Sequence, residues 1–140
     1  MKYLVIIAVC LIVSNKTGSA CSCLRSNITQ VICSSSFVAT MRINSEPQKC
    51  NNKKDYCYSV SVENMIKGSN YNITQIRTSA STACGIKFKI DNLYLMASRN
   101  TNVTYLRAYA CGYRENWTKY SPEMKSEKKT SIESISCPIR

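Results

Sequence analysis

Cysteine is the residue type in this chain with the most obvious chemistry, and Cys21 and Cys23 stand one residue apart after the small residues Gly18-Ser19-Ala20. Eight of the nine cysteines lie beyond residue 20, namely Cys21, Cys23, Cys33, Cys50, Cys57, Cys84, Cys111 and Cys137. An even number of cysteines in a small secreted domain is typical of a disulfide framework. Metal binding is the rival interpretation of the Cys-x-Cys spacing, although the chain has no histidine to share the ligation.

The first 20 residues have the pattern of a secretory signal peptide. Lys2 supplies the positive start, residues 4–13 are uniformly apolar, and Gly18-Ser19-Ala20 places small residues at the cleavage site. The apolar run is too short to span a membrane. We therefore expect residues 1–20 to be removed, residues 21–140 to form one domain, and the protein to be secreted and extracellular, without membrane insertion.

Cleavage after Ala20 would make Cys21 the first residue and give it a free α-amino group. A disulfide at Cys21 would hold this amine in place, and its ordinary pKa of about 7.7–8.0 makes deprotonation near neutral pH easy. The amine nitrogen and the carbonyl oxygen of one residue close a five-membered ring on a metal ion. Such a pair can occupy the open position of a catalytic zinc in another protein. In this hypothesis the zinc belongs to the partner, and the chain has no cofactor of its own.

Other catalytic chemistry finds little support in the sequence. The absence of histidine excludes Ser-His-Asp and Cys-His arrangements. The chain has only four glycines and no Gly-rich phosphate loop. Its eight carboxylates are scattered, and no pair of them stands out for glycoside chemistry. We therefore do not expect an enzyme.

The chain is strongly basic, with a formal net charge of +11. Lys2 and Lys16 belong to the expected signal peptide, so 17 basic residues remain against 8 acidic ones, a net charge of +9. The basic residues are scattered, apart from a small cluster at Lys125, Lys128 and Lys129. This distribution favours a role in solubility. Glycosaminoglycan is the alternative acidic partner outside a cell, and nucleic acid is not expected.

The elements that must position these residues are mainly strands. Segments rich in β-formers or alternating apolar and polar residues are 37–43, 58–66, 73–78, 86–90, 93–97 and 103–110. Helices are expected over residues 27–34, capped by Ser26, and from Pro122 to about Ser131, capped by Ser121. About five antiparallel strands between two helices predict an all-β fold with flanking helices, a closed five-stranded barrel plugged by Trp117.

Beyond residue 20, four Asn-x-Thr sequons, at Asn27, Asn72, Asn102 and Asn116, fit surface loops of a secreted glycoprotein.

Several landmarks in order resemble the N-terminal inhibitory domain of the tissue inhibitors of metalloproteinases. They are the opening spacing of Cys21, Cys23 and Cys33, the stretches YSVSVENMIKG (58–68), TSASTACG (78–85) and YLMA (94–97), and Cys111 followed by Asn116-Trp117. The resemblance covers essentially all of residues 21–140. It implies a netrin-like module with an OB-like barrel.

The resemblance also implies disulfide pairs and site residues. By order, Cys21 pairs with Cys84, Cys23 with Cys111, and Cys33 with Cys137, which leaves Cys50 and Cys57 for a local bridge. Cys21 would chelate the zinc of a secreted or cell-surface metalloproteinase of the matrix type, and Ser22 would enter its specificity pocket. The other expected protease contacts are Cys23, Leu24, Arg25, Thr82 and Ala83.

Two further expectations accompany this reading. The chain extends only three residues beyond Cys137, so we expect the inhibitory domain without the family's second, six-cysteine domain. The alternative function is a basic netrin-like module that binds glycosaminoglycan or extracellular proteins without inhibiting a protease. A secreted effector with unrelated partners is a third reading, because one barrel fold serves many functions.

Overall fold

The computed structural model describes residues 21–23, 27–68, 71–80, 84–99, 102 and 104–138; the expected signal peptide lies outside them. Two helices and seven strands follow one another in these residues. In chain order they are α2 (Ile28–Ser34), β1 (Phe37–Ile43), β2 (Gln48–Lys49), β3 (Asp55–Lys67), β4 (Gln75–Ser79), β5 (Leu93–Ser98), β6 (Tyr105–Ala108), β7 (Tyr113–Asn116) and α3 (Pro122–Glu133). Neither described helix is long and apolar enough to cross a membrane.

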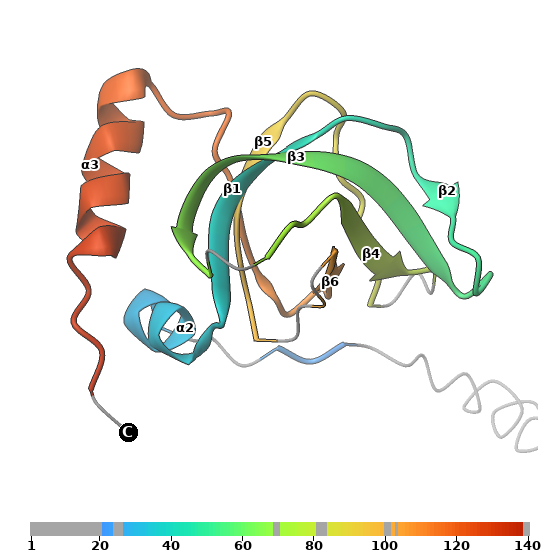
Figure 1. Ribbon diagram of the computed structural model, residues 1–140, viewed down its shortest axis with the longest axis horizontal. Coiled ribbons are helices and arrows are strands. Elements are labelled where there is room, and N and C mark those ends of the chain that lie inside the picture. The colour runs from blue at the N-terminus through green and yellow to red at the C-terminus, as the bar shows by residue number, and fades with distance from the viewer. Residues whose placement is uncertain are drawn as a thin grey trace, which may run out of the picture.

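The strands form one curled sheet in the order β6-β4-β3-β1-β5-β7, with β2 paired to β3. The long strand β3 bends over β1 and β4 (Figure 1). All pairs are antiparallel except β4 with β6, which run parallel. The expectation of purely antiparallel strands is therefore wrong. A parallel pair needs a long crossover, and here β5 lies within the connection between β4 and β6.

The expected closed five-stranded barrel is not confirmed. The curled sheet brings β6 back into contact with β5. Within the described residues, however, no hydrogen-bonded ladder joins these two strands. The sheet is a half-barrel, whereas the β-rich fold, the flanking helices and the disulfide stapling agree with the expectation.

Two hydrophobic clusters cover the two faces of this sheet. Alternate residues of β1 point into the curl, where Phe37, Met41 and Ile43 are fully buried. The outer face is covered by the two helices, and its cluster comprises Ile32, Val38, Leu93, Leu95, Ala97, Trp117 and Ile132. Trp117 is thus buried between the sheet and the helices, not inside the barrel as expected.

The segment predicted as a strand over residues 86–90 is not a strand. Its alternation is real, because Ile86 and Phe88 are buried. Its backbone N–H groups, however, donate to side chains instead of a neighbouring strand. Ile86 donates to the Thr78 hydroxyl at 2.8 Å, and Phe88 donates to the Tyr58 hydroxyl at 3.4 Å. Side-chain hydroxyls thus accept the hydrogen bonds that a neighbouring strand would otherwise accept. The periodicity of the sequence alone does not reveal which acceptor is used.

Both predicted helices are present. The first begins at Ile28 and is capped by Asn27, whose side chain accepts from the N–H of Thr29, so the expected cap at Ser26 is wrong. The second begins at Pro122 after the cap Ser121, as expected.

Candidate functional site

Residues 21–23 are fixed at both ends by disulfides. Cys21 is bonded to Cys84 with Cα atoms 5.5 Å apart, and Cys23 is bonded to Cys111 with Cα atoms 5.1 Å apart. Ser22 between them is exposed. The side chain of Ser22 is therefore presented to solvent from a segment that has little freedom to move.

The two segments that receive these disulfides are themselves joined. The N–H of Ala110 donates to the carbonyl of Cys84 at 3.1 Å. The Sγ of Cys111 lies 3.6 Å from the Ser22 carbonyl oxygen, a contact without a proton because a disulfide sulfur has none to donate. The 21–23 segment thus belongs to a closed ring of two disulfides, one backbone hydrogen bond and the intervening chain.

A tight turn presents Cys111 to this ring. The N–H of Gly112 donates to the carbonyl of Tyr109 at 2.9 Å. A Cβ at position 112 would lie 3.2 Å from that carbonyl oxygen, so glycine suits the close approach. The ring of Tyr109 is 41% exposed and stands beside the Arg107 guanidinium, 5.8 Å from the ring centre.

The segment that leads from β4 to Cys84 is anchored on both sides. Before it, Ala80 donates its N–H to the carbonyl of Lys54 at 3.0 Å. After it, the hydrogen bond from Ile86 to the buried Thr78 hydroxyl returns the chain to β4. The expected contact residues Thr82 and Ala83 fall between these anchors in the sequence, but they lie outside the described residues. Leu24 and Arg25 also lie outside the described residues.

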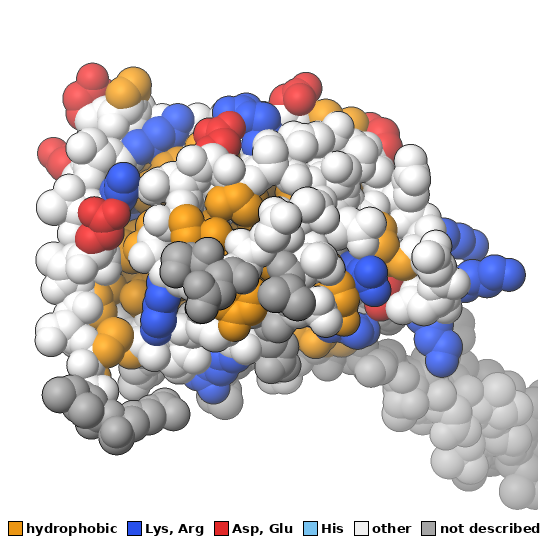
Figure 2. Space-filling model, in the orientation of Figure 1, with side chains coloured by type: hydrophobic (Ala, Val, Ile, Leu, Met, Phe, Trp, Pro, Cys, Tyr) orange, Lys and Arg blue, Asp and Glu red, His pale blue; other side chains and the backbone are white. Residues whose placement is uncertain are grey.

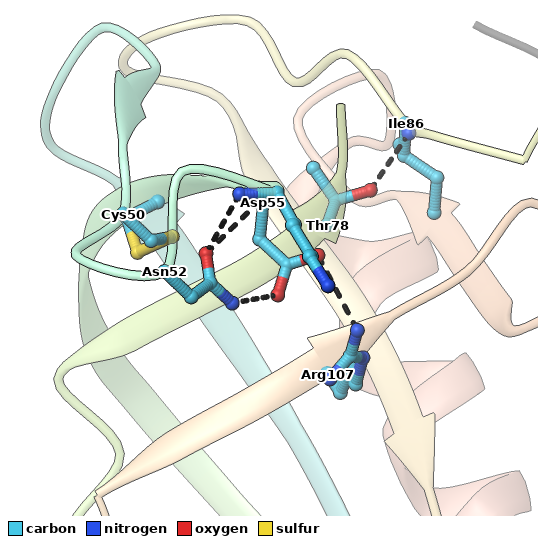
Figure 3. Close-up of polar contacts among 8 residues, drawn as sticks. Cys50, Asn52, Asp55, Thr78, Ile86 and Arg107 are labelled. Carbon is cyan, nitrogen blue, oxygen red and sulfur yellow. Dashed lines mark hydrogen bonds and ion pairs between the residues drawn. A yellow bond between two sulfur atoms is a disulfide. The ribbon is translucent and has the colours of Figure 1, made fainter. Parts of the chain in front are cut away.

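A buried carboxylate supports the same end of the sheet (Figure 3). Asp55 is 2% exposed, and its carboxylate accepts from the Asn52 amide at 2.8 Å and from Arg107 at 3.3 Å. The Asn52 side chain in turn accepts from the backbone N–H of Asp55 at 3.1 Å. Because Arg107 belongs to β6, this network ties the start of β3 to the strand that leads into Ala110 and Cys111.

A surface groove of about 240 Å³ lies along the seam between β5 and β6, beside the turn at Cys111. Its lining includes Arg99, Arg107 and Arg114. On the face drawn in Figure 2, Lys and Arg side chains occur at several places among acidic ones, in agreement with the scattered charge of the sequence. The three arginines of the groove are a local exception.

All eight cysteines of residues 21–140 are in disulfides. Three of the pairs, including Cys33 with Cys137, are those implied by the resemblance, and the two cysteines that it leaves over, Cys50 and Cys57, form the fourth. No thiolate remains among them to bind a metal. The described residues contain no group of three or more His, Cys, Asp or Glu side chains placed to hold a metal ion. The interpretation of the eight cysteines as four disulfides is therefore confirmed by the pairs themselves.

Sequence reasoning missed several residues that hold the site. Ala110 acts through its backbone, so no side-chain signal marks it. Thr78 shares the alternation of the buried Ile76 in β4, which was a usable sign that its side chain points inward. Asp55 and Asn52 appeared only as scattered polar residues, although Asn52 three positions before Asp55 is a spacing at which side chain and backbone commonly bond.

A β-rich domain stapled by four disulfides, with Cys21 and Cys23 clamped on either side of the exposed Ser22, has the form of a rigid binding domain. A protein-family model described as tissue inhibitor of metalloproteinase matches residues 19–140. The chain belongs to this family. No curated protein sequence matches the chain.

Family membership makes the protein a metalloproteinase inhibitor in general terms, and places a metalloproteinase among its partners. Members of the family are inhibitors rather than enzymes, and they are secreted. The four disulfides fit an extracellular protein.

Proposed function

We propose that the protein is secreted after cleavage behind Ala20 and inhibits zinc metalloproteinases by capping their catalytic zinc with the amine and carbonyl of Cys21. Ser22 enters the specificity pocket of the protease. Leu24 and Arg25 extend along one side of the cleft, and Thr82 and Ala83 occupy the other. Matrix-type metalloproteinases are the expected targets.

The observation that carries this proposal is the clamped 21–23 segment. A ligand whose geometry is set before binding loses less entropy when it binds, and so gains affinity. Here the Cys21–Cys84 and Cys23–Cys111 disulfides fix the segment, and the hydrogen bond from Ala110 to Cys84 fixes the two supports relative to each other. The exposed Ser22 supplies a small side chain that can enter a pocket.

The clamped turn also gives a reason why the segment inhibits and is not cleaved. A protease cuts a continuous peptide that runs through its cleft. In this proposal the near side of the cleft is filled from residues 82–84 and the far side from residues 21–25. A disulfide joins the two sides in place of a peptide bond.

The test compares two refolded, disulfide-intact proteins, one beginning at Cys21 and one with an extra alanine before Cys21. The alanine converts the free amine into an amide, which is a poor zinc ligand, and leaves the fold unchanged. We expect inhibition of a matrix metalloproteinase catalytic domain by the first protein and a loss of at least about 100-fold in affinity for the second, an effect of roughly 2.7 kcal/mol.

Equal inhibition by both proteins would remove zinc capping as the mechanism. No inhibition by either protein, across several metalloproteinases, would favour the alternative of a basic binding module. The arginines of the groove between β5 and β6 would then be the first residues to test for glycosaminoglycan binding. Sequencing of the secreted protein from its amino terminus tests the cleavage site directly.

A further inference from the structure

Three of the four glycosylation sequons have the same local structure. In each, the asparagine Oδ1 accepts a hydrogen bond from the backbone N–H of the threonine two residues later. The distances are 2.9 Å for Asn27, 3.4 Å for Asn102 and 3.0 Å for Asn116. This turn occupies the amide oxygen. Among the described residues, the amide nitrogen, to which a sugar would be attached, has no hydrogen-bond partner in any of the three.

The directions of the strands separate Asn27 from the other sequons. The parallel strands β4 and β6 both lead toward the site, since Cys84 follows β4 and Cys111 follows β6. Asn72 and Asn102 precede these strands and therefore lie at the opposite end of the sheet. Asn116 is the last residue of β7, which runs away from the turn at Cys111, and it is only half exposed.

Asn27, in contrast, is exposed and lies four residues after Cys23. Four residues of fully extended chain span at most about 14 Å, so the Asn27 Cα lies within that distance of the Cys23 Cα.

The helix that begins at Asn27 is itself held in place. Ile32 is buried against the outer face of the sheet, and the Lys67 ammonium donates to the Ile32 carbonyl at 3.1 Å. The Cys33–Cys137 disulfide anchors its last turn. The direction in which Asn27 leaves the surface is therefore set by the fold.

We propose that Asn27 carries an N-linked oligosaccharide that stands beside the 21–23 segment and limits which metalloproteinases this segment can enter. The inference rests on the proposed function. In the attachment step the Asn27 Nδ2 loses a proton and forms a bond to the anomeric carbon of an oligosaccharide carried on a lipid pyrophosphate. The anomeric C–O bond breaks, and the lipid pyrophosphate leaves with the proton. A bulky glycan at this position collides with the rim of a narrow protease cleft and leaves a wide one accessible.

The experiment uses the full chain secreted from glycosylating cells, with its amino terminus verified at Cys21. Mass spectrometry of glycopeptides reads the occupancy of Asn27. Two variants remove the sequon by different routes. Asn27→Asp keeps a side-chain acceptor that caps α2, and Thr29→Ala keeps Asn27 itself, because the cap uses only the Thr29 backbone. Asn102→Asp is the matched control at the far end of β6.

Inhibition constants are measured for all four proteins against a panel of metalloproteinase catalytic domains. We expect Asn27 to be occupied. We also expect Asn27→Asp and Thr29→Ala to inhibit at least one protease about tenfold or more tightly than the wild type, while Asn102→Asp does not. An unoccupied Asn27, or equal inhibition by all four proteins across the panel, overturns the glycan proposal alone. An absence of inhibition by every form, including the two that lack the Asn27 glycan, overturns the proposed function and this inference with it.

Discussion

The backbone N–H of Ala110 donates to the carbonyl of Cys84 at 3.1 Å, and through it the two disulfide anchors of the amino-terminal segment become one unit. Without this bond, the segments that carry Cys84 and Cys111 would be joined only through the β4–β6 pairing, which ends at Thr78 and Ala108. With it, the position of Cys21 and Ser22 relative to both supporting segments is set by two disulfides and one hydrogen bond.

Removing the Cys23–Cys111 disulfide with the double change Cys23→Ser and Cys111→Ser should weaken inhibition strongly and speed hydrogen exchange of the Ala110 amide. The chain-entropy model also gives a stability loss of about 4.6 kcal/mol for its separation of 88 residues. Protease assays, amide exchange and urea unfolding measure the three effects.

The matched control is the double change Cys50→Ser and Cys57→Ser. Its separation of 7 residues predicts a smaller stability loss, about 2.4 kcal/mol. Inhibition and Ala110 exchange should remain near the wild type. Equal losses of inhibition in both double variants would contradict the positioning role assigned to the Cys23–Cys111 disulfide.

Thr78→Val should destabilise the protein by about 1–3 kcal/mol, because it leaves the buried N–H of Ile86 without its acceptor. Thr78→Ser retains the hydroxyl and should lose less. Urea unfolding compares the two variants with Thr74→Val, whose hydroxyl makes only a 3.4 Å exposed contact. A loss in Thr78→Val no larger than that in Thr74→Val would contradict the role assigned to the Thr78 hydroxyl.

Asp55→Asn should also lower the free energy of unfolding by about 1–3 kcal/mol. The amide NH₂ would face the N–H donors from which the carboxylate now accepts hydrogen bonds. Most of this loss should come from the contact between Asp55 and Asn52. The Arg107 side chain is 43% exposed, so solvent screens its attraction to the carboxylate. Glu63→Gln breaks the exposed Arg42–Glu63 pair and should change the free energy of unfolding by about 0–1 kcal/mol. A loss at Asp55 no larger than this control would contradict the role assigned to the network.

Glu115 predicts a dependence of stability on acid pH. Burial by itself would raise the pKa of Glu115, but hydrogen bonds from Tyr120, Lys128 and Tyr113 outweigh it, and the net pKa is lowered. A lowered folded-state pKa contributes stability above the ordinary glutamate pKa of about 4.3 and loses it as the pH falls through the folded value.

The free energy of unfolding should therefore fall as the pH is lowered from roughly pH 5 to pH 3, a range around the ordinary glutamate pKa. The fall should be steeper for the wild type than for Glu115→Gln. Because Lys128 lies on α3 and Glu115 on β7, the loss should appear first as weaker docking of α3. Parallel curves for the two proteins would show that Glu115 is not the titrating group. Glu127→Gln, on the same helix, serves as the control.

Much of the fold could be predicted from the sequence, because its signals are local. The β-formers of residues 37–43 became β1 with the same bounds, and Ser121-Pro122 started α3 where cap chemistry placed it. The family could also be recognised from local motifs, because cysteine spacing and short stretches of sequence can be compared without knowing which contacts they make.

What failed depended on partners distant in sequence. Residues 86–90 alternate like a strand, yet the hydroxyls of Thr78 and Tyr58 take the hydrogen bonds that a neighbouring strand would have received. Strand direction has the same origin, because nothing in β4 or β6 alone specifies that they run parallel.

The sequence by itself determined that eight cysteines and a set of strands would make a β-rich domain stapled by disulfides. Only the tertiary structure decided that Ala110 and Cys84 meet, that Asp55 supports β6, and that Asn72 and Asn102 lie at the opposite end of the sheet from Cys84 and Cys111. Cysteine count, charge and periodicity are properties of single segments. A hydrogen bond between residues 26 positions apart exists only after the sheet has curled and brought β6 beside the segment that follows β4.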